Sequence, residues 1–189
     1  MYEIRSVLVI LHSMNQSFYV ISAEEKSVIL NRLSTYLNEP VEKVDELYPV
    51  WEAIILGGLL KLVRNRIRFN ALYNFILQKS APINDIEAFL SADKQKYDED
   101  VILHYGEGMM GILIPDKKSA IAMLLSREMG AKSSAILKGL TLFFGLYGYR
   151  LKQEEYEALK DWKAYGEYFL SLKQQFYVLC PARIQLGVS

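Results

Sequence analysis

The sequence predicts a mainly α-helical protein, a multi-helix bundle around a long central hydrophobic helix, with one small β-hairpin. Three observations support this fold class. Apolar residues recur at helical spacing along most of the chain, and the longest apolar stretch runs from Pro49 to Lys79. In residues 101–114, two β-prone runs flank a glycine-rich turn, which is typical of a hairpin.

Length and composition predict one ordered domain over residues 1–189. The chain is 51% hydrophobic and 23% charged, which is the composition of a folded globular protein with a sizeable core. Residues 91–100 crowd acids and bases around Gln95 and Tyr97. If the chain divides into two lobes, we expect the boundary in this charged linker.

The N-terminal third is expected to be helical. Residues 4–11 fit both a helix and a strand, and we favour the helix. Ser22 and Glu25 have the spacing of a capping box, which predicts a helix from Ala23 to Leu37. A short acidic helix from Val41 to Leu47 should follow.

The stretch from Pro49 to Lys79 is predicted to form the central helix, or two helices that meet near Gly57-Gly58 or near Asn65. Pro49 suits the first turn of a helix, because its missing N–H has no intrahelical partner there. From Phe69 to Leu77 apolar residues occur on every side, so this half should belong to the core.

Beyond this stretch, Asn84 is expected to cap a short helix that ends at Leu90. The runs Val101–Tyr105 and Gly111–Ile114 are predicted to pair as the hairpin. Three further helices should follow.

Asp116 is expected to cap a helix through Met129, which Gly130 should end in a left-handed conformation. The helix from Ala135 to about Arg150 is apolar nearly all round and should be buried. A last helix is expected from Gln153 to about Tyr177.

The spacing of Gly106, Gly108 and Gly111 matches the G-x-G-x-x-G pattern of a phosphate-binding loop. In a dinucleotide-binding fold the third glycine opens a helix, whereas here a β-prone run ends at Pro115. We therefore favour a hairpin turn over a phosphate loop.

Catalytic and metal-binding motifs are not evident, and we expect no cofactor and no metal site. His12 and His104 have no partner ligand at a metal-binding spacing, and the single cysteine, Cys180, has no neighbouring histidine. A His104–Glu107 catalytic pair is a weaker alternative than a structural histidine. We lean against an enzyme, and keep as an alternative an enzyme whose dispersed residues surround the Gly106–Gly111 loop.

The central stretch carries the one dense basic cluster, Lys61, Arg64, Arg66 and Arg68. At 100° per residue, Lys61, Arg64 and Arg68 fall within an arc of about 60° on a continuous helix. Arg66 would then be buried and paired, unless the helix changes register near Asn65. This basic face is either solvated, or binds an acidic protein partner, or binds nucleic acid.

Neutral net charge and 13 tyrosines favour protein contacts over nucleic acid. The apolar runs 53–60 and 139–149 are too short to span a membrane, so we expect a cytoplasmic protein. We predict a non-catalytic helical interaction or regulatory module that docks a protein partner or forms a homo-oligomer. The alternative is a nucleic-acid-binding regulator that uses Lys61, Arg64 and Arg68.

Overall fold

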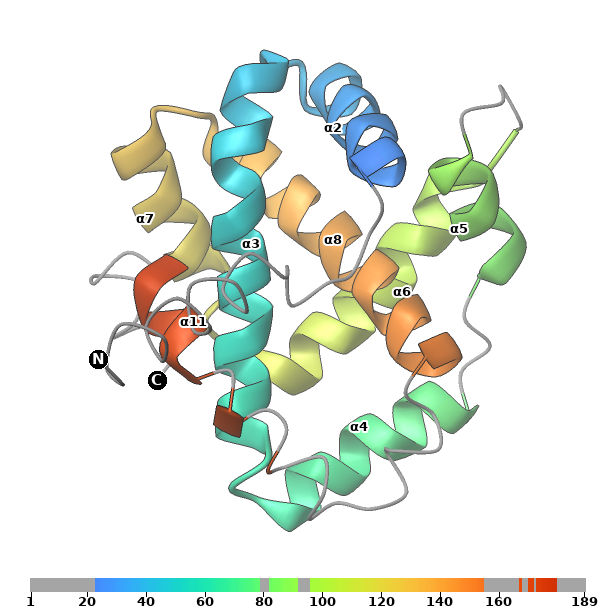
Figure 1. Ribbon diagram of the computed structural model, residues 1–189, viewed down its shortest axis with the longest axis vertical. Coiled ribbons are helices and arrows are strands. Elements are labelled where there is room, and N and C mark those ends of the chain that lie inside the picture. The colour runs from blue at the N-terminus through green and yellow to red at the C-terminus, as the bar shows by residue number, and fades with distance from the viewer. Residues whose placement is uncertain are drawn as a thin grey trace, which may run out of the picture.

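The computed structural model describes residues 23–78, 82–91, 96–154, 167, 170–171 and 173–179. These residues form helices α2 (Ala23–Leu37), α3 (Val41–Leu62), α4 (Arg66–Gln78), α5 (Ile83–Leu90), α6 (Glu99–Leu113), α7 (Lys118–Met129), α8 (Ser133–Glu154) and α11 (Lys173–Leu179). Figure 1 shows α3 standing upright through the molecule, with α8 and α6 crossing beside it and α4 below. The predicted helical bundle is confirmed.

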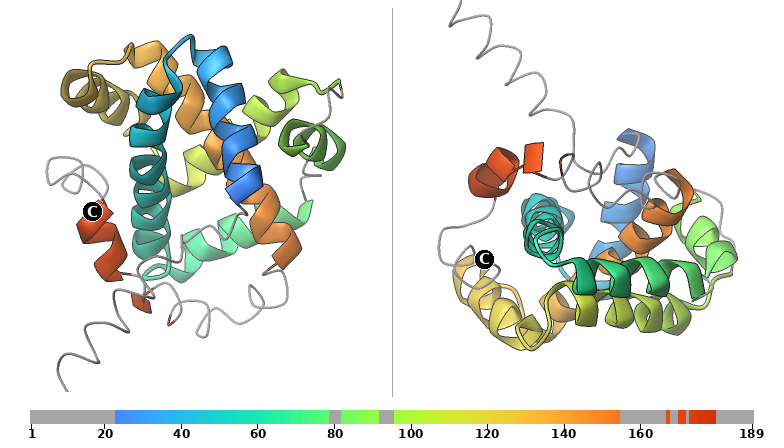
Figure 2. Two further views of the ribbon diagram at one scale, coloured as in Figure 1. Left: turned by 45° about the horizontal axis from the view of Figure 1, so that its top comes forward. Right: turned by 90° about the horizontal axis from the view of Figure 1, so that it is seen from below.

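Helix α3 is the centre of the core. Every residue from Val50 to Leu60 is buried, and α2, α6, α8 and α11 all contact this helix. Figure 2 shows the same helix between α2 on one side and α11 on another. The prediction of a long central hydrophobic helix is therefore confirmed.

The predicted start of this helix is wrong, because α3 begins at Val41 and continues through Pro49. A proline inside a helix removes one backbone hydrogen bond and costs about 3 kcal/mol. Here Leu47, Tyr48, Val50 and Trp51 are all buried around it. Burial of these four side chains offsets the cost, so the expected short helix of residues 41–47 is the first part of α3.

The central stretch divides at Asn65, the second of the two predicted positions. The side-chain Oδ1 of Asn65 accepts hydrogen bonds from the N–H groups of Ile67 (3.1 Å) and Arg68 (3.2 Å). These two bonds satisfy N–H groups that have no intrahelical acceptor, as an N-cap does. Asn65 therefore lies in the turn after α3 and caps the start of α4.

We expect Asn65→Ala to lower the free energy of unfolding by about 1 kcal/mol, because it removes both capping bonds. Asn65→Asp should retain most of the stability, since the carboxylate keeps an acceptor at the helix start. Urea unfolding of the three proteins measures the difference. Equal destabilisation by both substitutions would contradict the capping role.

The predicted hairpin is wrong, because residues 101–114 lie almost wholly within helix α6 and the described residues contain no strand. The buried residues of α6 recur at helical spacing: Ile102, Tyr105, Gly106, Met109, Met110 and Leu113. Asp98 caps the helix by accepting the N–H of Asp100 at 3.1 Å.

Close packing of α6 against α8 explains why this β-prone, glycine-rich stretch is helical. A Cβ atom on Gly106 would lie 2.0 Å from the carbonyl oxygen of Thr141, and one on Gly145 would lie 2.7 Å from that of Ile102. Glycine at both positions lets the two backbones approach more closely than side chains allow. The glycines are therefore packing positions.

The other predicted helices differ mainly at their starts. Helix α2 has the predicted bounds, whereas Asn84 lies inside α5 and Pro82 occupies the cap position. Asp116 does not occupy the predicted cap position of α7 and has a φ of 61°. The residue before the helix is Lys117, whose side chain makes no capping hydrogen bond. Gly130 ends α7 with a φ of 66°, as predicted.

Helix α8 is buried at every residue from Gly139 to Tyr149, as its apolar circumference predicted. The segment of residues 4–11, His12, Ser22, Cys180 and most of the predicted helix from Gln153 to Tyr177 lie outside the described residues. Among the described helices, none is both long and apolar enough to cross a membrane.

Candidate functional site

Four basic residues lie where α3 turns into α4, a turn that is at the lower end of the molecule in Figure 1. Lys61 lies in the last turn of α3, Arg64 in the connecting turn, and Arg66 and Arg68 in the first turn of α4. The turn between α6 and α7 adds a fifth. We call this set the basic corner: Lys61, Arg64, Arg66, Arg68 and Lys117.

Contacts between three elements hold the basic corner together. The Arg68 Nη2 donates to the carbonyl oxygen of Ile112, in the last turn of α6, at 3.4 Å. Partial burial, and then the charges of Lys117 and Arg68, hold the pKa of Lys61 below its ordinary value. Lys61, Arg68 and Lys117 thus converge from α3, α4 and the α6–α7 turn.

This concentration of positive charge is unfavourable for the fold itself. The first turn of α4 contains no acidic residue, although the N-terminus of a helix carries partial positive charge and favours acids there. Arg66 and Arg68 occupy that turn instead. These positive charges repel one another and the positive end of the helix dipole. An anionic ligand would relieve both repulsions.

Arg66 is exposed, which decides between the two alternatives for this residue. The chain divides at Asn65, and Arg64 and Arg66 on either side of it are both exposed. Ile67 lies among these bases and is 82% exposed. The basic corner therefore combines charge with one projecting apolar side chain.

We expect Lys61→Gln to raise the melting temperature at pH 7, because it removes the charged group that the fold disfavours. A lysine whose folded pKa is lowered costs stability below that folded pKa, and the cost disappears as pH rises through the unfolded value of 10.5. The gain should therefore shrink as pH rises towards 10.5. A lower melting temperature for the variant at pH 7 would contradict the repulsive arrangement.

A second charged surface lies at the start of α5 and α6. It is a hollow of about 620 Å³, which we call the acidic hollow, lined by Asp85, Lys96, Tyr97, Asp98, Glu99 and Asp100. Asp85 Oδ1 accepts the N–H of Asp98 at 2.8 Å, which joins α5 to the segment before α6. Burial raises the pKa of Glu99.

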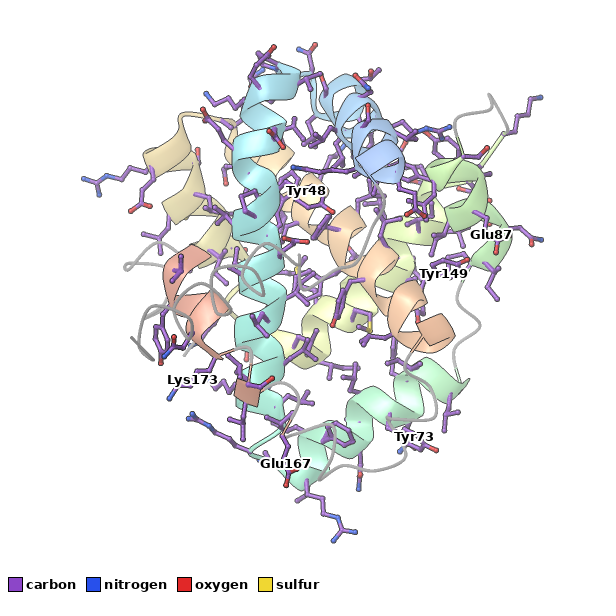
Figure 3. The ribbon with its side chains drawn as sticks, in the orientation of Figure 1. Tyr48, Tyr73, Glu87, Tyr149, Glu167 and Lys173 are labelled. Atoms are coloured by element: carbon purple, nitrogen blue, oxygen red, sulfur yellow. The ribbon has the colours of Figure 1, made fainter. Side chains whose placement is uncertain are left out.

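Contacts from α2 and α8 hold α5 and Tyr97 beside the acidic hollow. The Arg32 guanidinium of α2 donates to the carbonyl oxygen of Ser91 at 2.7 Å and lies 5.0 Å from the centre of the Tyr97 ring. The hydroxyl of Tyr149 on α8 donates to Glu87 Oε1 of α5 at 2.8 Å, and Figure 3 shows these two residues on the same side of the molecule. Both contacts hold α5 in place.

The three glycines of the predicted phosphate motif do not form a loop. Gly106 packs on α8, a Cβ on Gly108 would lie 2.5 Å from the Phe75 ring, and Gly111 has open space around it. His104 and Glu107 are exposed on the same helix. In the described part of the chain, no group of three or more His, Cys, Asp or Glu residues is placed to hold a metal ion.

Sequence reasoning identified four residues of the basic corner and missed Lys117. No local pattern relates Lys117 to Lys61, since the packing of α6 against α3 and α4 brings the α6–α7 turn to this end of α3. For the acidic hollow, the sequence predicts only a charged linker over residues 91–100. Whether that linker divides two lobes stays a prediction.

Comparisons with protein-family models, with curated proteins and with solved structures find no match to this chain. Function must therefore be inferred from the chemistry of the site. The fold and site define a helical protein with two oppositely charged surfaces.

Proposed function

We propose that this protein is a non-catalytic helical interaction module that docks an acidic protein surface on its basic corner. The convergence of Lys61, Arg68 and Lys117 from three separate elements is the observation that carries the proposal. Within the described residues, the salt bridge Lys26–Asp45 lies near the opposite end of α3. Arg64 and Arg66 are exposed on the corner, so groups on another molecule can reach them.

Ile67 favours a protein partner over nucleic acid. Protein interfaces commonly combine an apolar centre with arginines and a polar rim. A nucleic-acid backbone offers phosphates along its length and little that an exposed isoleucine can contact. The neutral net charge also gives no long-range attraction to nucleic acid.

Fluorescence anisotropy with a labelled oligoglutamate peptide tests this function, beside a single-stranded oligonucleotide of equal charge. We expect the peptide to bind, and binding to weaken with salt because exposed charges are screened. The variant Lys61→Ala/Arg64→Ala/Arg68→Ala should lose about tenfold in affinity.

The matched control is Lys43→Ala/Arg127→Ala/Lys132→Ala, which removes the same charge from the opposite ends of α3 and α7. We expect its affinity to stay close to that of the wild type. Equal losses in both variants would show attraction by net charge alone and would contradict a site at the corner. Tighter binding of the oligonucleotide would favour the nucleic-acid alternative.

A further inference from the structure

Helix α6 separates the two charged surfaces of the molecule. Asp98, Glu99 and Asp100 lie at its start, and Lys117 follows its end. The helix has 15 residues, which corresponds to about 22 Å. In Figure 1 the α3–α4 turn is at the bottom, whereas α5 and the start of α6 are at the upper right. The basic corner of one chain therefore cannot reach the acidic hollow of the same chain.

We propose that the acidic surface docked by the basic corner is the acidic hollow of a second copy of this chain. This inference rests on the proposed function and names its partner. Charge complementarity is the first argument. Four carboxylates line the hollow with one lysine, and five bases form the corner. Because Lys plus Arg equals Asp plus Glu at 22 each, no net repulsion opposes the approach of two copies.

Shape is the second argument. The basic corner is a turn between two helices, with Arg64, Arg66 and Ile67 exposed on it. The acidic hollow is a shallow, open depression, and Tyr97 is one of its lining residues. A projecting Ile67 can pack against that aromatic residue while the flanking arginines reach the carboxylates. Within the hollow, the hydrogen bond from the Asp98 N–H to Asp85 Oδ1 joins two of the lining residues, which reduces the ordering required on docking.

Charge exchange between the two surfaces tests this pairing. The corner variant is Arg64→Glu/Arg66→Glu, at exposed positions. The hollow variant is Asp98→Asn/Asp100→Lys, in which asparagine retains an acceptor for the α6 cap. Each variant alone loses most of the charge on one of its two surfaces, so its copies can pair only a weakened surface with an intact one and should be monomeric. In a mixture, the intact corner of the hollow variant meets the intact hollow of the corner variant, so the two proteins should associate.

Sedimentation velocity measures the result. For the wild type at low salt, we expect a weight-average mass that rises above the 21.8 kDa of one chain as concentration increases. It should return to that mass in 1 M salt, where the screening length is about 3 Å. Arg127→Glu/Lys132→Glu, which has the charge change of the corner variant, should associate like the wild type.

A wild type that is monomeric at every concentration would overturn the proposal, as would association of either variant alone or a mixture that stays monomeric. Circular dichroism of each variant establishes that it is folded, and the wild-type salt series needs no variant. The hollow variant keeps its basic corner and should still bind oligoglutamate. A monomeric wild type that binds oligoglutamate would overturn self-docking alone, whereas loss of both would also overturn the proposed function.

Discussion

Gly106→Ala is expected to lower the free energy of unfolding by about 3 kcal/mol. The added Cβ would lie 2.0 Å from the Thr141 carbonyl oxygen and 3.0 Å from the Gly145 nitrogen, both of them backbone atoms. Backbone cannot rotate away as a flexible side chain can, so α6 and α8 must separate. Urea unfolding followed by circular dichroism measures the loss.

Gly111→Ala is the matched control on the same helix, because a Cβ there meets nothing within 4 Å. Alanine is the better helix former, so we expect this variant to gain about 0.5 kcal/mol or more. In a hairpin turn the two substitutions would have no such opposite effects. Similar stability changes at both glycines would contradict the α6–α8 packing.

Trp51→Ala is expected to cost about 3–5 kcal/mol, as truncation of a large buried aromatic side chain does. Trp51 is fully buried on α3, and its ring centre lies 5.9 Å from that of Phe143 on α8. Its ring also fills the space that a side chain on Gly139 would need. The side chain thus joins α3 to α8. Since domains are stable by only about 5–15 kcal/mol, the variant should be close to unfolding at 37 °C.

Trp51→Phe is the informative comparison. The indole Nε1 of Trp51 is buried and has no hydrogen-bond partner among the described residues, so phenylalanine removes an unsatisfied donor while it keeps most of the packing. We expect a loss well below that of Trp51→Ala in the same unfolding measurement. Equal losses would show that the part of the indole that phenylalanine lacks, and not a buried aromatic ring in general, carries the stabilisation.

Periodicity predicted the helical class, the core position of α3 and α8, and the bounds of α2, because these depend on local pattern and burial. It failed at Val101–Ile114, where β-branched residues and glycines favour strand and turn. There the packing of Gly106 against Gly145 of α8 overrides local propensity. It also failed at Pro49, where burial of the neighbouring side chains outweighs the missing hydrogen bond.

The candidate site was predictable to the extent that it is local. Lys61, Arg64, Arg66 and Arg68 are close in sequence, and Asn65 was one of the two predicted points of division. Its capping bonds account for the exposure of Arg66. Lys117 and the acidic hollow required the fold, since each depends on how α6 packs against helices distant in the chain.

The most direct test of the account compares Lys117→Ala with Lys118→Ala in the oligoglutamate anisotropy measurement. The two residues are adjacent and carry the same charge, but only Lys117 is among the charges that lower the pKa of Lys61. We predict that Lys117→Ala weakens binding several-fold, as Lys61→Ala does, whereas Lys118→Ala has a smaller effect. Equal affinities for the two variants would contradict the convergence of Lys61, Arg68 and Lys117 into one docking surface.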